Sequence, residues 1–172
     1  MTGNDEKTPL EIERKYLIRF PDLKRLEEKP NCEKIEIVQT YLQSKDDTEV
    51  RVRMRGKDGR YLFYRTEKRR ITDTSRAEVE RRITQEEYAV YLADADPLRR
   101  PVRKMRYCLT ENSRYYEIDV FPEWKKQAIL EVELRSENEE VVFPEEVQVI
   151  REVTSDRRYL NHALAVDMPE ED

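Results

Sequence analysis

Apolar and polar residues alternate with a period of two along most of the chain. Between Leu10 and Ile18, positions 10, 12, 16 and 18 are apolar or aromatic, while Glu11, Glu13 and Lys15 occupy alternate positions. This alternation is typical of a β-strand with one buried face. The chain is therefore predicted to consist mainly of strands.

Similar segments, most of them rich in β-branched and aromatic residues, recur along the sequence. They span residues 35–42, 50–54, 61–68, 77–83, 102–109, 115–121 and 129–134, and residues 147–150 are a candidate for a further short strand. Gly56-Lys57-Asp58-Gly59 predicts a hairpin turn between two of these strands. The predicted sheet is therefore antiparallel at least in part.

Three helices are predicted between and after the strands. One spans Pro21–Glu28 and opens with proline, which suits a first helical turn. A second begins after the N-cap candidate Thr84 and continues to about residue 95, and a third is capped at Ser155-Asp156 and runs to Leu164. No repeat or long linker divides the chain, so we expect a single domain over residues 1–172, with an ordered core at about 9–165.

Charge is unusually dense and nearly balanced. Asp, Glu, Lys and Arg make up 41% of the 172 residues, against about 25% in average soluble domains. The net charge is only −5, and the chain contains ten tyrosines. Disordered tails have high net charge and few aromatic residues. We therefore expect a folded domain with enough residues for a real core.

The composition excludes several classes of site. The single histidine, His162, excludes histidine-based metal clusters and disfavours a Ser-His-Asp triad. Three glycines are too few for a P-loop or a dinucleotide fingerprint. Cys32 and Cys108 are interpreted as two reduced thiols.

Partners and location follow from the same evidence. The acidic balance argues against nucleic-acid binding. No apolar stretch approaches the ~20 residues of a membrane span, and the N-terminus is too polar for a signal peptide. We therefore expect a cytoplasmic monomer or homodimer with neither a membrane nor a nucleic-acid partner.

The charged positions of the strands are segregated by sign. The charged face carries Glu11, Glu13 and Lys15; Arg51 and Arg53; Lys68 beside the uncharged Thr66; Glu78 and Glu80; Lys104 and Arg106; Glu117 and Asp119; and Glu131 and Glu133. A solvated face is the simplest interpretation, but it does not explain whole strands of one sign. A sheet with many strands can close into a barrel, and charges inside it would require pairing, water or a ligand.

The two kinds of charge indicate two kinds of ligand. Arginine and lysine clusters bind phosphate oxygens. Carboxylates without histidine or cysteine favour hard cations such as Mg²⁺ or Mn²⁺. Together, the two sets describe a metal-assisted phosphoryl-transfer site.

Several motifs resemble those of the CYTH superfamily, the triphosphate tunnel metalloenzymes. The first is Glu11-Ile12-Glu13-Arg14-Lys15, which resembles the ExExK signature. The later motifs follow in the family's order: Gln39–Leu42, Arg51–Arg53, Thr66–Lys68, Glu78–Glu80, Lys104–Arg106, Glu117–Asp119, Leu130–Glu133 and the closing segment Val153–Asn161. The resemblance extends over about residues 9–165. The superfamily includes class IV adenylyl cyclases, thiamine triphosphatases and inorganic triphosphatases.

The resemblance implies an α+β fold: a closed eight-stranded antiparallel β-barrel, the triphosphate tunnel, with a few flanking helices. It implies a metal site for Mg²⁺ or Mn²⁺ formed by Glu11, Glu13, Glu131 and Glu133, with help from Asp119 or Glu117. It also implies a triphosphate site formed by Lys15, Arg51, Arg53, Lys68, Lys104 and Arg106. Arg158 is a further candidate for substrate binding. Arg157 and Arg158 are either surface residues of the last helix, or one of them closes the tunnel mouth.

Related thiamine triphosphatases imply a catalytic Lys–Tyr pair. Lys68 and Tyr41 match it best, and Glu13 is counted with them as catalytic. For Tyr41 the alternative is a packing aromatic. For Glu78 and Glu80 we favour a role as charge partners that orient the arginines.

Four functions remain open at this point. Metal-dependent hydrolysis of a triphosphate is favoured, with inorganic tripolyphosphate ahead of nucleoside or thiamine triphosphates. An adenylyl cyclase would use the same site to convert ATP to cyclic AMP and pyrophosphate. A non-catalytic polyphosphate or nucleotide sensor and a structural barrel with a charged exterior are the other two.

Overall fold

The protein forms a single antiparallel sheet. A computed structural model describes residues 12–45, 47–70 and 76–172. Glu11 lies outside these residues. The strands found in the described chain are β1 (Ile12–Arg19), β2 (Cys32–Tyr41), β3 (Thr48–Lys57), β4 (Arg60–Arg70), β5 (Arg76–Ile83), β6 (Val102–Glu111), β7 (Arg114–Val120), β8 (Gln127–Leu134) and β9 (Val149–Glu152). Their order is β5-β4-β3-β2-β6-β7-β8-β1-β9.

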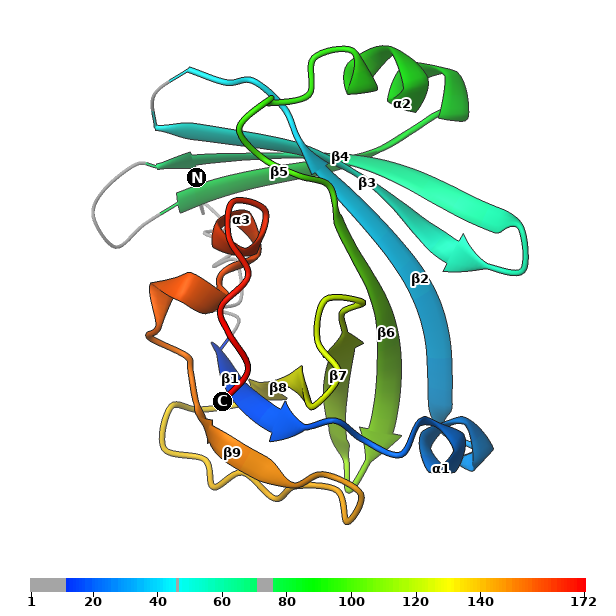
Figure 1. The fold of residues 1–172 in the computed structure, drawn as a ribbon, viewed down its shortest axis with the longest axis vertical. Coiled ribbons are helices and arrows are strands. Elements are labelled where there is room, and N and C mark those ends of the chain that lie inside the picture. The colour runs from blue at the N-terminus through cyan, green and yellow to red at the C-terminus, as the bar shows by residue number, and fades with distance from the viewer. Residues whose placement is uncertain (1–11, 46, 71–75) are drawn as a thin grey trace, which may run out of the picture.

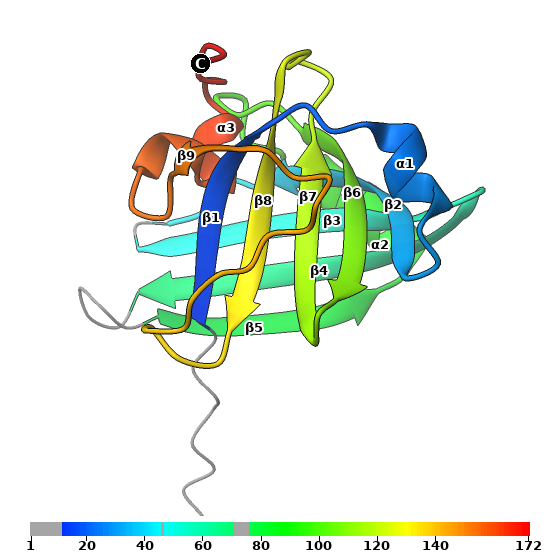
Figure 2. The same ribbon diagram turned by 90° about the horizontal axis from the view of Figure 1, so that it is seen from below.

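The sheet is strongly curved, so that its two halves face each other. In Figure 2, strands β1, β8 and β7 run across strands β3, β4 and β5, which lie behind them. Long β2 joins the halves by pairing with both β3 and β6. The sheet therefore has a concave face between the halves and a convex face outside.

The helices cover the outside and one opening of this curved sheet. Figure 1 shows α1 (Leu23–Glu28) and α2 (Gln85–Leu92) outside the sheet. The same view places α3 (Asn161–Leu164), which follows the 3₁₀ turn η1 (Arg157–Tyr159), between the two halves. In the described part of the chain, no helix has both the length and the apolar character needed to cross a membrane.

The predicted helix starts and the hairpin turn have clear local causes. Thr84 and Glu87 form the capping box that begins α2, as expected. The first helix starts at Leu23 and not at Pro21, because the Asp22 side chain accepts a hydrogen bond from the Arg25 amide. The last helix is broken, because Leu160 is extended (φ −69°, ψ 142°) between η1 and α3.

The β3–β4 turn is a tight hairpin at the predicted place. Asp58 and Gly59 both have positive φ, 53° and 75°, as a two-residue type I′ turn requires. A side chain at Gly56 would lie 2.0 Å from the Arg60 carbonyl oxygen. Glycine at position 56 therefore permits the close approach of the two strands.

Apolar side chains gather on the convex face. Leu26 of α1 packs with Tyr16, Tyr107 and Leu130, and partly buried residues of the segment between β8 and β9 complete this cluster. On the other half, Tyr88 of α2 joins a second cluster on β3 and β4. Because alternate residues point to opposite faces, the charged partners of these strands face the concave side.

The predicted closed eight-stranded barrel is wrong in strand number and closure. The sheet has nine strands, and within the described residues its edge strands β5 and β9 do not pair with each other. The free edge of β1 is taken by β9, with Tyr16 opposite Glu152. The opening between the halves is filled by the C-terminal segment, whose Tyr159 and Leu164 are buried against Leu17 and Tyr41. An open antiparallel α+β fold is therefore present.

Candidate functional site

Three arginines form a row on the concave face of β3. Arg51, Arg53 and Arg55 occupy alternate positions and are half-buried. The Nε atoms of Arg51 and Arg53 are buried without a hydrogen-bond partner. Burial and the neighbouring Arg51 charge lower the pKa of Arg53, against the opposing effect of Glu80. Desolvated cations of this kind favour an anionic ligand.

The Glu80 carboxylate contacts this row. Glu80 Oε1 lies 3.1 Å from an Arg53 terminal nitrogen and accepts a second hydrogen bond from the Thr66 hydroxyl. Glu80 is thus an orienting charge partner of Arg53, the role favoured for it above. It offsets part of the positive charge and leaves a net excess on β3.

Across the concave face, Lys104 and Arg106 of β6 share one buried carboxylate. Lys104 Nζ donates to Asp119 Oδ2 at 2.8 Å, and Arg106 donates to both Asp119 oxygens at 2.8 and 2.9 Å. Burial alone would raise the pKa of Asp119, but the two cations outweigh it and hold that pKa well below its usual range. Asp119, proposed above as a metal ligand, is occupied by these two cations.

Carboxylates concentrate on β1, β8 and β7. Glu13 is opposite Glu133, and Glu131 is opposite Glu117, so the four lie on adjacent strands of the same face. Lys15 Nζ is 3.2 Å from Glu131 Oε1. Glu117 contacts Arg106, yet burial raises its pKa above the usual value.

The chemistry of these carboxylates suits a hard cation. They offer oxygen ligands only, which is the chemistry of Mg²⁺ and Mn²⁺ sites. Among the described residues, however, no three acidic, histidine or cysteine side chains converge closely enough to hold an ion. Glu11, the remaining predicted ligand, lies outside them.

Lys68 and Tyr41 are not neighbours in the sheet register. Tyr41 is opposite Arg51, whereas Lys68 of β4 is opposite Glu49 and lies 3.9 Å from Glu78. The Tyr41 side chain is 1% exposed, and its hydroxyl accepts a hydrogen bond from Gln39 at 2.7 Å. Burial raises the pKa of Tyr41 to about 12. Its position matches the packing interpretation.

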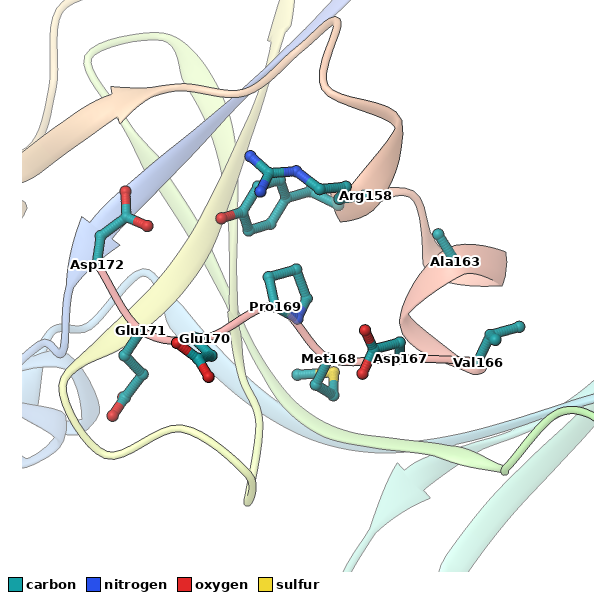
Figure 3. Close-up of a pocket in the computed structure, with 10 residues that line it drawn as sticks. Arg158, Ala163, Val166, Asp167, Met168, Pro169, Glu170, Glu171 and Asp172 are labelled. Carbon is teal, nitrogen blue, oxygen red and sulfur yellow. The ribbon is translucent and has the colours of Figure 1, made fainter.

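Arg158 lies in a different pocket. This cavity of about 850 Å³ is formed by η1, α3 and the C-terminal tail, and Figure 3 shows Arg158 on its wall. The guanidinium is engaged by Asp156, with contacts of 3.0 and 2.7 Å. Four carboxylates share the lining (Asp167, Glu170, Glu171 and Asp172). Their charge opposes a phosphate ligand at this position.

Comparison with known proteins decides the family. The sequence model of the CYTH domain matches residues 9–159. The chain belongs to the CYTH family. The resemblance of the motifs to CYTH proteins is therefore confirmed.

Solved structures resemble the CYTH fold of this chain over most of its length. Two crystal structures of NE1496, described as a hypothetical protein and as an inorganic triphosphatase, share 29% and 28% identity with it and have TM-scores of 0.64. They cover 93% and 94% of this chain, and the matches span 100% and 97% of their own. PH1012 from Pyrococcus horikoshii OT3 (24% identity, TM-score 0.52) covers 75% of this chain, with 80% of its own matched, and supports the fold alone. No curated protein matches the sequence.

The site predicted from the sequence does not include Arg55 of this CYTH fold. Arg55 continues the β3 row beyond Arg53 and acts electrostatically on it. The signal was present in the sequence, because Arg55 follows Arg53 at the same two-residue spacing. The predicted strand ended at residue 54, one position too early to include it.

Proposed function

We propose that this CYTH protein is a metal-dependent triphosphatase and that inorganic tripolyphosphate is its preferred substrate. The observation that carries the proposal is the arginine row on β3, in which the buried Nε atoms of Arg51 and Arg53 lack hydrogen-bond partners. A small polyanion would provide the missing acceptors and relieve the mutual repulsion of these cations. The similarity to an inorganic triphosphatase supports the same substrate class.

The basic residues of the concave face are proposed to bind phosphate oxygens and to supply positive charge around them. Arg51 and Arg53 would donate to the phosphate oxygens and stabilise the charge that shifts during transfer. Lys104 and Arg106, fixed by Asp119, would face them from β6. Lys15 and Lys68 are proposed to contribute further positive charge. We assign no proton transfer to Tyr41, because its raised pKa and burial oppose one.

The carboxylates are proposed to hold the metal. Glu11, Glu13, Glu131 and Glu133 would supply the oxygen ligands, with help from Glu117. Bound Mg²⁺ or Mn²⁺ would neutralise phosphate oxygens. A water oxygen bonds to the terminal phosphorus in line with the bridging oxygen, a carboxylate takes the proton, and pyrophosphate leaves.

The test is phosphate release by the purified protein with Mg²⁺ and then Mn²⁺. Tripolyphosphate, ATP and thiamine triphosphate are offered, and pyrophosphate and cyclic AMP are followed in parallel. We expect metal-dependent phosphate release that is fastest with tripolyphosphate. Glu13→Gln should abolish it while tripolyphosphate still binds, and Arg103→Ala, an exposed arginine on the convex face, should retain it.

Other results would overturn specific parts of the proposal. Cyclic AMP formed from ATP would identify a cyclase. Tight binding without turnover of any substrate would favour the sensor. Full activity of Glu13→Gln would remove that residue from the metal site.

A further inference from the structure

The basic row of β3 is longer than a triphosphate needs. Arg51, Arg53, Arg55 and Lys57 alternate along the strand and share its concave face. At about 3.4 Å per residue, the row extends roughly 20 Å. The distance between the first and third phosphorus atoms of a triphosphate is about the distance between two successive basic residues of this row. Positive charge therefore continues beyond the substrate proposed above.

The hairpin holds the end of this row in place. Lys57 is opposite Arg60 across the two-residue turn, and both belong to the face that carries Arg55. Gly56 permits the close contact of the strands, because a side chain there would meet the Arg60 carbonyl oxygen. The two terminal cations are thus presented by a tight, fully paired hairpin.

A cavity of about 880 Å³ lies at this end. Its wall includes Ile35, Arg55, Lys57, Arg60, Leu62 and Tyr64. Two carboxylates, Glu33 and Asp58, also line it. Glu33 lies 3.6 Å from Lys57, but both side chains are more than half exposed, so the pair contributes little. Among the described residues, Arg55 and Arg60 have no carboxylate within ion-pair distance.

We propose that this cavity is a subsite for the continuing chain of an inorganic polyphosphate longer than three phosphates. The terminal phosphates bind at Arg51 and Arg53, and the rest of the chain passes Arg55 and leaves between Lys57 and Arg60. This assignment rests on the proposed function for the terminal site. The subsite itself makes binding dependent on chain length.

The experiment compares tripolyphosphate with a longer linear polyphosphate of defined length. Binding is measured by calorimetry in EDTA, and KM is measured with metal present. Lys57→Ala/Arg60→Ala removes two exposed cations from the hairpin tip. We expect the double variant to bind the longer polyphosphate at least about tenfold more weakly, because one or two charge-assisted contacts are lost. Tripolyphosphate should bind as it does to the unmodified protein.

Arg103→Ala is the matched control, because it removes an exposed arginine from the convex face. The subsite would be overturned if the double variant lost equal affinity for tripolyphosphate and for the longer polyphosphate, or lost affinity for neither. It would also be overturned if Arg103→Ala lost as much affinity as the double variant. A selective loss of ATP binding would assign the cavity to an organic group and would also overturn it. If the protein turned over no substrate but its binding still depended on chain length, the proposed triphosphatase activity would be rejected and the subsite would stand. Failure of one proposal can therefore be distinguished from failure of the other.

Discussion

Two buried cations depend on the Asp119 carboxylate. Lys104 and Asp119 are each 3% exposed, and Arg106 is 9% exposed. Removal of one partner from a buried ion pair is costly, because the remaining charges lose their compensation. Asp119→Asn should therefore lower the free energy of unfolding by about 3–5 kcal/mol at pH 7, measured by urea denaturation. Glu67→Gln, which breaks only partly exposed contacts on the convex face, should cost less than about 1 kcal/mol.

The same carboxylate sets a pH dependence. The folded-state pKa of Asp119 is lowered, so its stabilising effect is present above the unfolded value of about 3.9. It is lost as the pH falls through the lower folded-state value. The difference between Asp119→Asn and the unmodified protein should stay constant from about pH 7 to pH 5 and shrink in stronger acid. A difference that instead grew in acid would contradict an ionised Asp119.

At the residue scale, alternation predicted which side chains share a face, and the arginines of β3 confirm it. Alternation could not predict which charges neutralise one another. Lys104, Arg106 and Asp119 come from two strands, and their hydrogen bonds depend on burial and register. Tyr41 shows the same limit, because its burial depends on the distant residues Tyr159 and Leu164.

At the scale of one element, the β3–β4 hairpin depends on Gly56. A methyl group there would lie 2.0 Å from backbone oxygen, so one strand must move. Gly56→Ala should lower the free energy of unfolding by about 1–3 kcal/mol, measured by urea denaturation. Gly59→Asn is the matched variant: φ is +75° with open space around the position, and asparagine tolerates this conformation. Equal losses in both variants would mean that turn conformation, and not close approach, controls the hairpin.

The hairpin and α2 were predictable because their signals are local. Thr84 and Glu87 satisfy each other within one helical turn, and Asp58-Gly59 suits a two-residue turn. The split of the last predicted helix was not predictable in the same way. Leu160 extends so that Tyr159 and Leu164 can both be buried, and that burial is a tertiary effect.

At the scale of the whole molecule, closure of the sheet was the main error. Period-two alternation fixes the faces of a strand but does not specify which edges meet. In this protein β9 covers the edge of β1, and the segment from Tyr159 to Leu164 lies where closure would have joined the halves. The charged side chains lie on the concave face of the open sheet, so the functional prediction does not require closure.

The same distribution of charge predicts how the whole fold responds to a polyanion. Arg51, Arg53 and Arg55 lie together on β3, and both Arg51 and Arg55 act unfavourably on Arg53. A ligand that binds only the folded state at about 100 times its Kd adds about 2.7 kcal/mol of stability. For a chain of this size, each kcal/mol corresponds to about 2–4 °C. Tripolyphosphate in EDTA should therefore raise Tm by roughly 5–10 °C, measured by thermal unfolding.

Sulfate at matched ionic strength separates this effect from general screening. Screening acts on all exposed charges, whereas tripolyphosphate can bridge successive arginines of the row. Sulfate should therefore raise Tm by clearly less, and Arg53→Gln should reduce the response to tripolyphosphate but not to sulfate. Equal responses to both anions would mean that the β3 arginines are a screened surface and that phosphate binding depends on the metal alone.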